Sequence, residues 1–490
     1  MKPGLILVSL AAAVCAPGQT ADALKADVSF LASDALEGRG TPSPGLTVAS
    51  EFVAAGFRRA GLEPAGDDGY FQTASYVEAT PSLEGFELTL DAAGKTIHVP
   101  KSALAVPQAA AVDLTRAAVW KAHPGDLPQL SPEQVDGKVL VISAGAPATG
   151  RGRLTLPPRL HPALVIRLAA GGDAGFVPRL REAGAPVQAP VVTVWDRDFR
   201  QALAAMKPGP LDAAVTARIP PPAETPVKLR NVVGLLRGSD PALAGTYLVV
   251  SAHYDHLGVR GTGPGDHIFH GANDDASGTA SVMEIALALK PALEGAPEGA
   301  RQSGPEGTRE GAPARPKRSI VFIAFFGEER GELGSHYYVR HPIFPLAQTV
   351  ADVNLEQLGR TDETGGPRVG MFNLTGFDFT NLPEVFRRAA AQTGIRLAKD
   401  EANSDRYFTA SDNAAFAEAG VPATTVSVTY SFPDYHGVGD EWPKLDYDNM
   451  AQVDRAIALA VRALADSAAA PEWNASNPAT EPFVKARGKH

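Results

Sequence analysis

The sequence predicts an α/β fold built on a largely parallel central sheet. Short apolar runs typical of strands end just before polar residues at 247–252, 319–326, 350–355 and 423–428. The run at 319–326 is almost entirely apolar, as expected for a strand that is buried on both faces. Helices are expected at 279–290, 382–392 and 450–469, the last two from their helical periodicity. The sequence therefore indicates a layered domain of strands and helices.

Residue types that bind metals follow these strands in order along the chain. The stretches are Ala252–Asp255, Gly271–Gly278, Phe326–Glu329, Asn354–Glu356 and Asp434–His436. In open α/β sheets, ligands bind in the crevice beyond the carboxyl ends of the strands. Imidazole nitrogens and carboxylate oxygens are the donors that zinc takes in catalytic sites. Five such stretches in one domain predict a two-metal hydrolase.

Each stretch taken alone has an ordinary structural explanation. A histidine after a strand is often a hydrogen-bonded structural residue, and paired glutamates commonly begin a solvated helix. Asp274 and Asp275 could simply cap the helix expected at 279–290. We favour the metal site because independent coincidences would not all fall at the ends of core strands.

These motifs resemble the co-catalytic zinc exopeptidases, a family that includes secreted bacterial aminopeptidases and glutamate carboxypeptidase. The resemblance covers roughly residues 24–90 and 226–470. It implies a mixed, mostly parallel central sheet flanked by helices, and two Zn²⁺ ions per chain. The metal ligands that it implies are His253, Asp274, Glu329, Glu356 and His436, with Asp274 bridging both ions.

The same resemblance implies three catalytic roles. Glu328 matches the general base, and Asp255 matches the residue that orients the imidazole of His253. Tyr435 matches a residue that hydrogen-bonds the reacting carbonyl oxygen in several members of the family.

One ligand position departs from the family pattern. The fifth ligand is most often an aspartate, whereas Asn354-Leu355-Glu356 offers a glutamate, whose longer side chain must fold back to reach the same point. Asp352 is an alternative, two residues earlier on the same strand face. We favour Glu356 because it aligns with the motif.

Length and composition suggest how the chain is divided. A chain of 490 residues is too long for one ordinary core. Lys2, the apolar run 5–14 and Ala21-Asp22-Ala23 have the form of a signal peptide, which predicts export to the periplasm or the exterior. The expected parts are a signal peptide at 1–23, the start of the peptidase domain at 24–89, an inserted β-rich domain resembling a protease-associated domain at 90–225, the zinc peptidase domain at 226–470 with a disordered loop at 291–317, and a flexible tail at 471–490.

The predicted function is that of an exported zinc-dependent aminopeptidase acting on peptides. A carboxypeptidase or a dipeptidase on the same scaffold is the rival enzyme, and a glutaminyl-cyclase-like reaction is disfavoured by the full set of ligands. A receptor that has lost catalysis is the rival from another class. The net charge of −10 argues against nucleic acid as a partner, and no stretch after the predicted signal is long and apolar enough for a membrane span.

Overall fold

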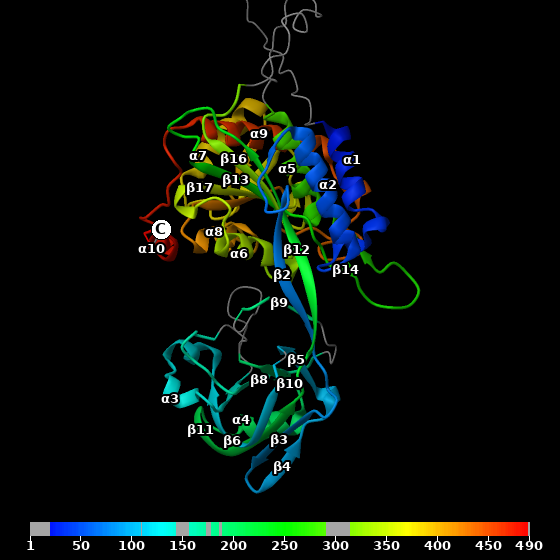
Figure 1. Ribbon diagram of the computed structural model, residues 1–490, viewed down its shortest axis with the longest axis vertical. Helices are drawn as coiled ribbons and strands as arrows, with labels where there is room; N and C mark the ends of the chain where they lie inside the picture. Colours follow the sequence, from blue (N-terminus) through cyan, green and yellow to red (C-terminus); the bar gives the residue numbers. More distant parts are fainter. Residues whose placement is uncertain are drawn as a thin grey trace, which may run out of the picture. The chain divides into compact units, whose positions relative to one another are not determined.

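The computed structural model describes residues 20–108, 110–143, 156–172, 178–185, 189–290 and 314–488 (Figure 1). Two compact units divide the chain: residues 1–73 with 230–490 form the larger one, and residues 74–229 form the smaller one. Most of the predicted signal peptide and most of the predicted loop at 291–317 lie outside the described residues.

The larger unit is built on a mixed sheet whose centre is parallel. The strand order is β21 (Arg396–Ala398), β20 (Met371–Leu374), β22 (Ala423–Ser427), β17 (Thr349–Leu355), β13 (Tyr247–His253), β16 (Ser319–Phe325), β12 (Ala223–Leu236) and β2 (Phe71–Thr80), with β1 (Glu63–Pro64) paired to β12. Strands β22, β17, β13 and β16 are parallel neighbours, and β12 runs antiparallel to β16. The predicted fold class of this unit is confirmed.

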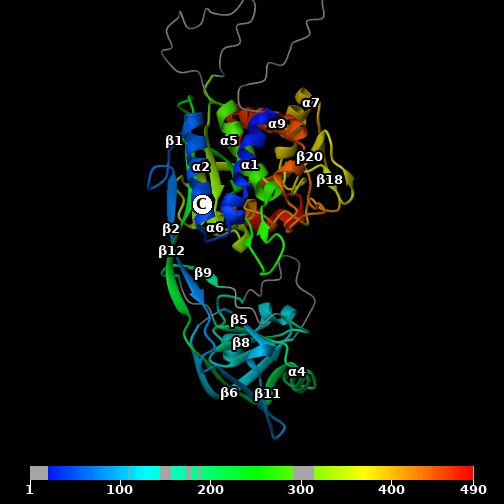
Figure 2. The same ribbon diagram turned by 90° about the vertical axis from the view of Figure 1, so that its right-hand side faces the viewer.

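Helices cover both faces of this sheet, whose central strands are buried on both sides (Figures 1 and 2). One face carries α1 (Ala21–Leu31), α2 (Pro44–Ala60), α5 (Ser277–Ala288) and α9 (Tyr447–Asp466), with α7 (Leu382–Thr393) beside α9. The other face carries α6 (Leu333–Arg340) and α8 (Asn413–Glu418). Side chains of β16 alternate accordingly: Phe322 packs near Phe57 of α2, whereas Phe325 packs near Tyr338 of α6 and Phe416 of α8.

The smaller unit is rich in β-structure, and its bounds differ from the predicted insertion at 90–225. Its eight strands follow the order β4 (Lys95–His98), β3 (Glu87–Ala92), β11 (Gly209–Ile219), β6 (Val112–Ala122), β7 (Val139–Ile142), β8 (Leu164–Leu168), β10 (Val191–Val194) and β5 (Leu104–Gln108). Two short helices, α3 (Pro132–Val135) and α4 (Arg197–Ala204), complete it, and β9 (Arg179–Glu182) pairs with residues 76–79 of β2. The unit begins at Ala74 rather than at residue 90, because residues 76–79 of β2 pair with β9 and β3 pairs with β11. Its likeness to a protease-associated domain stays a prediction.

Residues 471–488, which belong to the segment predicted as a flexible tail, include a helix and aromatic contacts. Helix α10 (Glu481–Arg487) forms there, and Phe483 stacks on Trp473 and packs near Phe408. The Trp473 indole N–H also donates to the Gly420 carbonyl oxygen at 2.9 Å. Two aromatic side chains thus give this polar segment enough apolar contact to fold onto the larger unit.

Helix α9 buries a carboxyl group that the metal site does not use. Asp454 is fully buried, and burial raises the pKa of its carboxyl to about 7, against the opposing effects of Ser281 and Arg455. A carboxyl whose pKa is raised on folding contributes stability below its unfolded pKa of about 3.9, and this contribution is lost as the pH rises through the folded value.

We therefore expect Asp454→Asn to become progressively more stable than the wild type as the pH rises. Between pH 5 and pH 8 the difference in unfolding free energy should move by roughly 2–3 kcal/mol in favour of the variant, because each pKa unit corresponds to about 1.4 kcal/mol. Urea unfolding at both pH values measures it, with the more exposed Asp466→Asn as the control. A pH-independent difference would contradict the expected linkage.

Among the described residues, no helix combines the length and the apolar character needed to cross a membrane.

Candidate metal centre and active site

The carboxyl ends of the four central parallel strands bring most of the predicted ligands together. His253 is the last residue of β13, Glu328 and Glu329 follow β16, and Glu356 follows β17. Because β17, β13 and β16 are neighbours in the sheet, these residues emerge at one edge. Asp274 reaches the same edge from the loop before α5.

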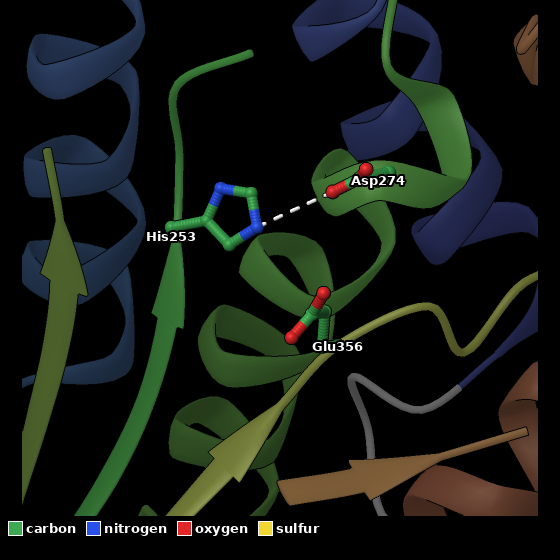
Figure 3. Close-up of side chains that lie close together, drawn as sticks. All are labelled: His253, Asp274 and Glu356. Atoms are coloured by element: carbon green, nitrogen blue, oxygen red, sulfur yellow. Dashed lines mark ion pairs between the residues drawn. The ribbon is translucent and has the colours of Figure 1, made fainter. Parts of the chain in front are cut away.

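His253, Asp274 and Glu356 form the first donor set (Figure 3). The Nε2 atom of His253 lies 3.3 Å from Oδ1 of Asp274, and one donor atom of each residue lies within 4.8 Å of the others. Glu356 is held at the strand end because its backbone N–H donates to the Val426 carbonyl oxygen at 3.1 Å. We call this set the first metal position.

Glu329 and His436 lie on the other side of Asp274. The Nε2 atom of His436 is 3.1 Å from Oδ2 of Asp274 and 3.2 Å from Oε1 of Glu329. Each oxygen of Asp274 therefore faces a different histidine, which is the arrangement expected of a bridging carboxylate. We call Asp274 Oδ2, Glu329 and His436 the second metal position.

The spacing and the missing hydrogen bonds of these atoms fit a cation. Two donors about 2.0–2.1 Å from one tetrahedral zinc ion lie roughly 3.3 Å apart, close to the separations observed here. His253 Nε2, His436 Nε2 and Glu329 Oε1 are buried and have no hydrogen-bond partner among the described residues. Buried polar atoms are seldom left in this state, because the loss of hydration costs free energy. The residues present therefore suit zinc.

The charges of the cluster also favour a bound cation. Burial acts to lower the pKa of His436, but contacts with Asp274 and Glu329 outweigh it and raise that pKa to about 10. Burial acts to raise the pKa of Asp274, yet His253 and His436 hold it well below its usual range. The carboxylates thus attract positive charge to the imidazoles, where protons and a metal ion compete.

Two further carboxylates, those of Asp440 and Asp275, hold the loop that carries Asp274. The carboxylate of Asp440 accepts the backbone N–H groups of Asn273 and Asp274 at 3.0–3.1 Å. Oδ1 of Asp275 accepts the N–H groups of Gly278 and Gln357 at 2.9 and 3.2 Å. Asp275 is therefore not a conventional cap: it ties the start of α5 to the segment that follows β17.

Asp255 supports both the first metal position and the turn of the general base. Nδ1 of His253 lies 3.5 Å from Asp255 Oδ1 and 3.2 Å from the Asp255 backbone oxygen. Oδ1 of Asp255 also accepts the backbone N–H of Glu328 at 3.0 Å, and Oδ2 accepts the hydroxyl of Thr41 at 2.9 Å. The carboxylate therefore does more than orient one imidazole, because it also fixes where Glu328 begins its turn.

The two remaining predicted residues differ in their surroundings. Glu328 is buried beside the donor sets, whereas Tyr435 is 40% exposed. The ring of Tyr435 stacks on the imidazole of His436 with 3.9 Å between centroids. Tyr435 therefore lies beside His436 of the second metal position and is partly open to solvent.

Asp352, the alternative to Glu356, lies away from both donor sets. It is buried in β17, accepts the hydroxyl of Ser251 at 2.8 Å, and belongs to neither donor set. Glu356 is the carboxylate that reaches His253 and Asp274.

Sequence reasoning missed three residues of the site: His256, Arg39 and Asp440. Nδ1 of His256 lies 3.0 Å from Oε1 of Glu329. Arg39 is fully buried and donates to four backbone carbonyl oxygens around the site. The signal for His256 was its place directly after His253-Tyr254-Asp255. Arg39 and Asp440 had no such signal, because their partners are distant in sequence.

Comparison with known proteins agrees with this geometry. Residues 231–461 match the family model of peptidase family M28. A probable zinc metalloprotease of Leptosphaeria maculans is 29% identical over 238 residues, which cover 47% of this chain and 46% of the relative. A probable zinc metalloprotease of Pyricularia oryzae is 34% identical over 148 residues, covering 29% of this chain and 22% of the relative. The chain thus spans less than half the length of these two curated relatives.

A solved structure has the same fold. The aminopeptidase from Aneurinibacillus sp. strain AM-1 aligns with a TM-score of 0.52 and 17% identity, covering 91% of this chain and 93% of its own.

The fold and the paired donor sets gather imidazole and carboxylate donors for two cations at the carboxyl edge of an α/β sheet. Residues 231–461 are a peptidase family M28 domain. This match agrees with the predicted resemblance to the co-catalytic zinc exopeptidases.

Proposed function

We propose that this chain is an exported aminopeptidase that holds two zinc ions and hydrolyses the first peptide bond of its substrates. The observation that carries the proposal is the place of Asp274, which groups with His253 and Glu356 through one side and contacts His436, itself beside Glu329, through the other. When bound, a zinc pair polarises the scissile carbonyl and lowers the pKa of water toward about 7.

The side chains around the metal positions divide the remaining work. Glu328 takes a proton from the attacking water at its carboxylate and returns it to the leaving amine. Asp255 positions Glu328 through the backbone N–H that it accepts. Tyr435, exposed beside His436, donates a hydrogen bond to the reacting carbonyl oxygen.

The charges near the loop that carries His436 indicate which end of a peptide substrate the site recognises. A carboxypeptidase needs a cation to grip the terminal carboxylate of its substrate. Arg360 is engaged by Asp362 and Asp434, and Lys444 also contacts Asp434, at 2.6–3.1 Å. These cations are neutralised inside the protein, which favours recognition of a free amine.

The acidic residues near the motif loops are the candidates for binding that amine. Asp255, Asp434 and Asp440 all have protein partners, so they are not the groups that receive the substrate amine. Glu332 also faces a protein partner, His336, at 3.5 Å, so we assign this contact to Glu441, which lies near Asp266 and His270.

Export and the role of the smaller unit complete the proposal. The signal-like pattern at 1–23 supports export. The β-rich unit at 74–229 supports an inserted accessory domain, which we assign to binding protein.

The test compares an aminoacyl-anilide with the same compound acetylated on its amine. We expect turnover of the first and loss of turnover of the second, with close to two zinc ions per chain and inactivation by a chelator. Equal turnover of both compounds, or a preference for blocked peptides with a free carboxyl terminus, would refute amine recognition. Zinc binding without hydrolysis of either kind would point to the receptor.

A further inference from the structure

The second metal position has a neighbour that the family pattern of five ligands does not include. We infer that His256 is a sixth metal-binding residue of this chain, donating from Nδ1 to the cation held by Asp274 Oδ2, Glu329 and His436. The inference rests on the proposed two-zinc function and adds an imidazole to one of its two positions.

The burial and contacts of the ring carry the argument. The side chain of His256 is fully buried, and neither ring nitrogen has a hydrogen-bond partner among the described residues. Nδ1 lies 3.0 Å from Glu329 Oε1 and 4.0 Å from Asp274 Oδ2. One donor atom each of His256, Asp274 and Glu329 lies within 4.8 Å of the other two, a grouping that could hold one metal ion.

The backbone holds the His256 ring in this place. The His256 N–H donates to the Arg39 carbonyl oxygen at 3.2 Å. The ring rests on Gly271, where a Cβ atom would lie only 2.4 Å from the His256 Cγ atom. Gly271 has a φ of 60°, which a side chain would also disfavour. The imidazole is therefore held in place before any metal binds.

An additional imidazole makes the two metal positions unequal. The first position has His253, Asp274 and Glu356, three protein residues that leave room for another ligand. The second would have four: Asp274, Glu329, His436 and His256. Three protein ligands with an open position are typical of catalytic zinc, and four are typical of structural zinc. The first position would then present the reacting water, and the second would retain its metal more firmly.

The first experiment uses the unmodified protein and needs no variant to fold. With cobalt in both positions, hyperfine-shifted NMR signals of exchangeable imidazole N–H protons count the histidines bound to metal. Three signals support the inference. Two signals, from His253 and His436 alone, overturn it. Binding of fewer than two metal ions per chain would instead refute the two-zinc function, and the inference with it.

The second experiment separates a metal ligand from a hydrogen-bond donor to Glu329. In His256→Asn, the amide nitrogen takes nearly the place of Nδ1, so a donor is kept while the imidazole is lost. We expect His256→Ala and His256→Asn each to weaken the second zinc by at least about 100-fold, beyond the usual effect of residues outside the ligand shell. His336→Ala, which removes a histidine paired with Glu332, is the control and should retain both zinc ions.

Chelator titrations of zinc-loaded protein measure both affinities. Wild-type affinity at both positions in His256→Ala would overturn the inference, and so would recovery of that affinity in His256→Asn. Circular dichroism of each variant identifies any variant that fails to fold. If the variants do not fold, the number of metal-bound histidines in the cobalt-loaded wild type decides whether His256 binds metal.

Discussion

Replacing Glu328 with glutamine is expected to leave both zinc ions in place and to lower kcat by about 10²–10⁴-fold. Glutamine keeps the size and shape of the side chain, but its amide cannot accept the proton of the attacking water. The backbone N–H of residue 328 still donates to Asp255, so the turn after β16 should survive the change.

The adjacent glutamate is a matched control for this prediction. Oε1 of Glu329 faces His256 and His436 at 3.0 and 3.2 Å, so Glu329→Gln removes a charged donor from the second metal position. Contacts with both histidines also overcome burial and the charge of Asp274 and lower the Glu329 pKa to about 2, so it is ionised at neutral pH. Zinc content and kcat should therefore separate the two variants. Equal loss of zinc in both would show that the roles are wrongly divided.

The sequence predicted the strand ends well because one physical rule applied to each of them. Strands β13, β16 and β17 are buried on both faces and read as mainly apolar runs in the sequence. The end of each run therefore marked where the polar side chains emerge. Because these three strands are parallel neighbours, the residues that follow them lie at the same edge of the sheet. His253, Glu329 and Glu356 follow from this rule.

Features that depend on contacts between distant segments could not be predicted in this way. No motif marks Asp440, yet its carboxylate accepts the backbone N–H groups of Asn273 and Asp274. The tail was expected to be flexible from its composition, yet it includes helix α10, and Phe483 stacks on Trp473. The composition of a segment says nothing about its contacts with distant residues, and the structure of the tail and the role of Asp440 both depend on such contacts.

Arg39 is the strongest case of this kind, and its replacement should be the most destabilising change outside the donor sets. Its Nε donates to the Tyr254 carbonyl oxygen at 2.8 Å, and its two terminal nitrogens donate to the carbonyl oxygens of Leu31, His270 and Gly271. One guanidinium therefore joins the end of α1 to the segments that carry His256 and Asp274.

The charge of Arg39 matters as much as its hydrogen bonds. Burial lowers its pKa to about 10, although Asp255, Asp440, Asp275 and Asp274 act to raise it. The group thus remains positive at neutral pH and balances carboxylates that have little access to water. Methionine at this position would fill similar space but would leave four buried carbonyl oxygens without that donor and the carboxylates without their counter-charge.

We expect Arg39→Met to lose about 3–5 kcal/mol of unfolding free energy, the usual cost of removing one partner from a buried charged network. Arg39→Lys should recover only part of it, because an ammonium group cannot reproduce the planar set of donors. Arg237→Met is the control: Arg237 pairs with Glu63 at the surface, and its loss should cost less than about 1 kcal/mol. Guanidinium unfolding of the metal-free proteins measures all three, so that zinc binding does not contribute. A loss for Arg39→Met as small as that for Arg237→Met would mean that the four carbonyl contacts do not hold the site together.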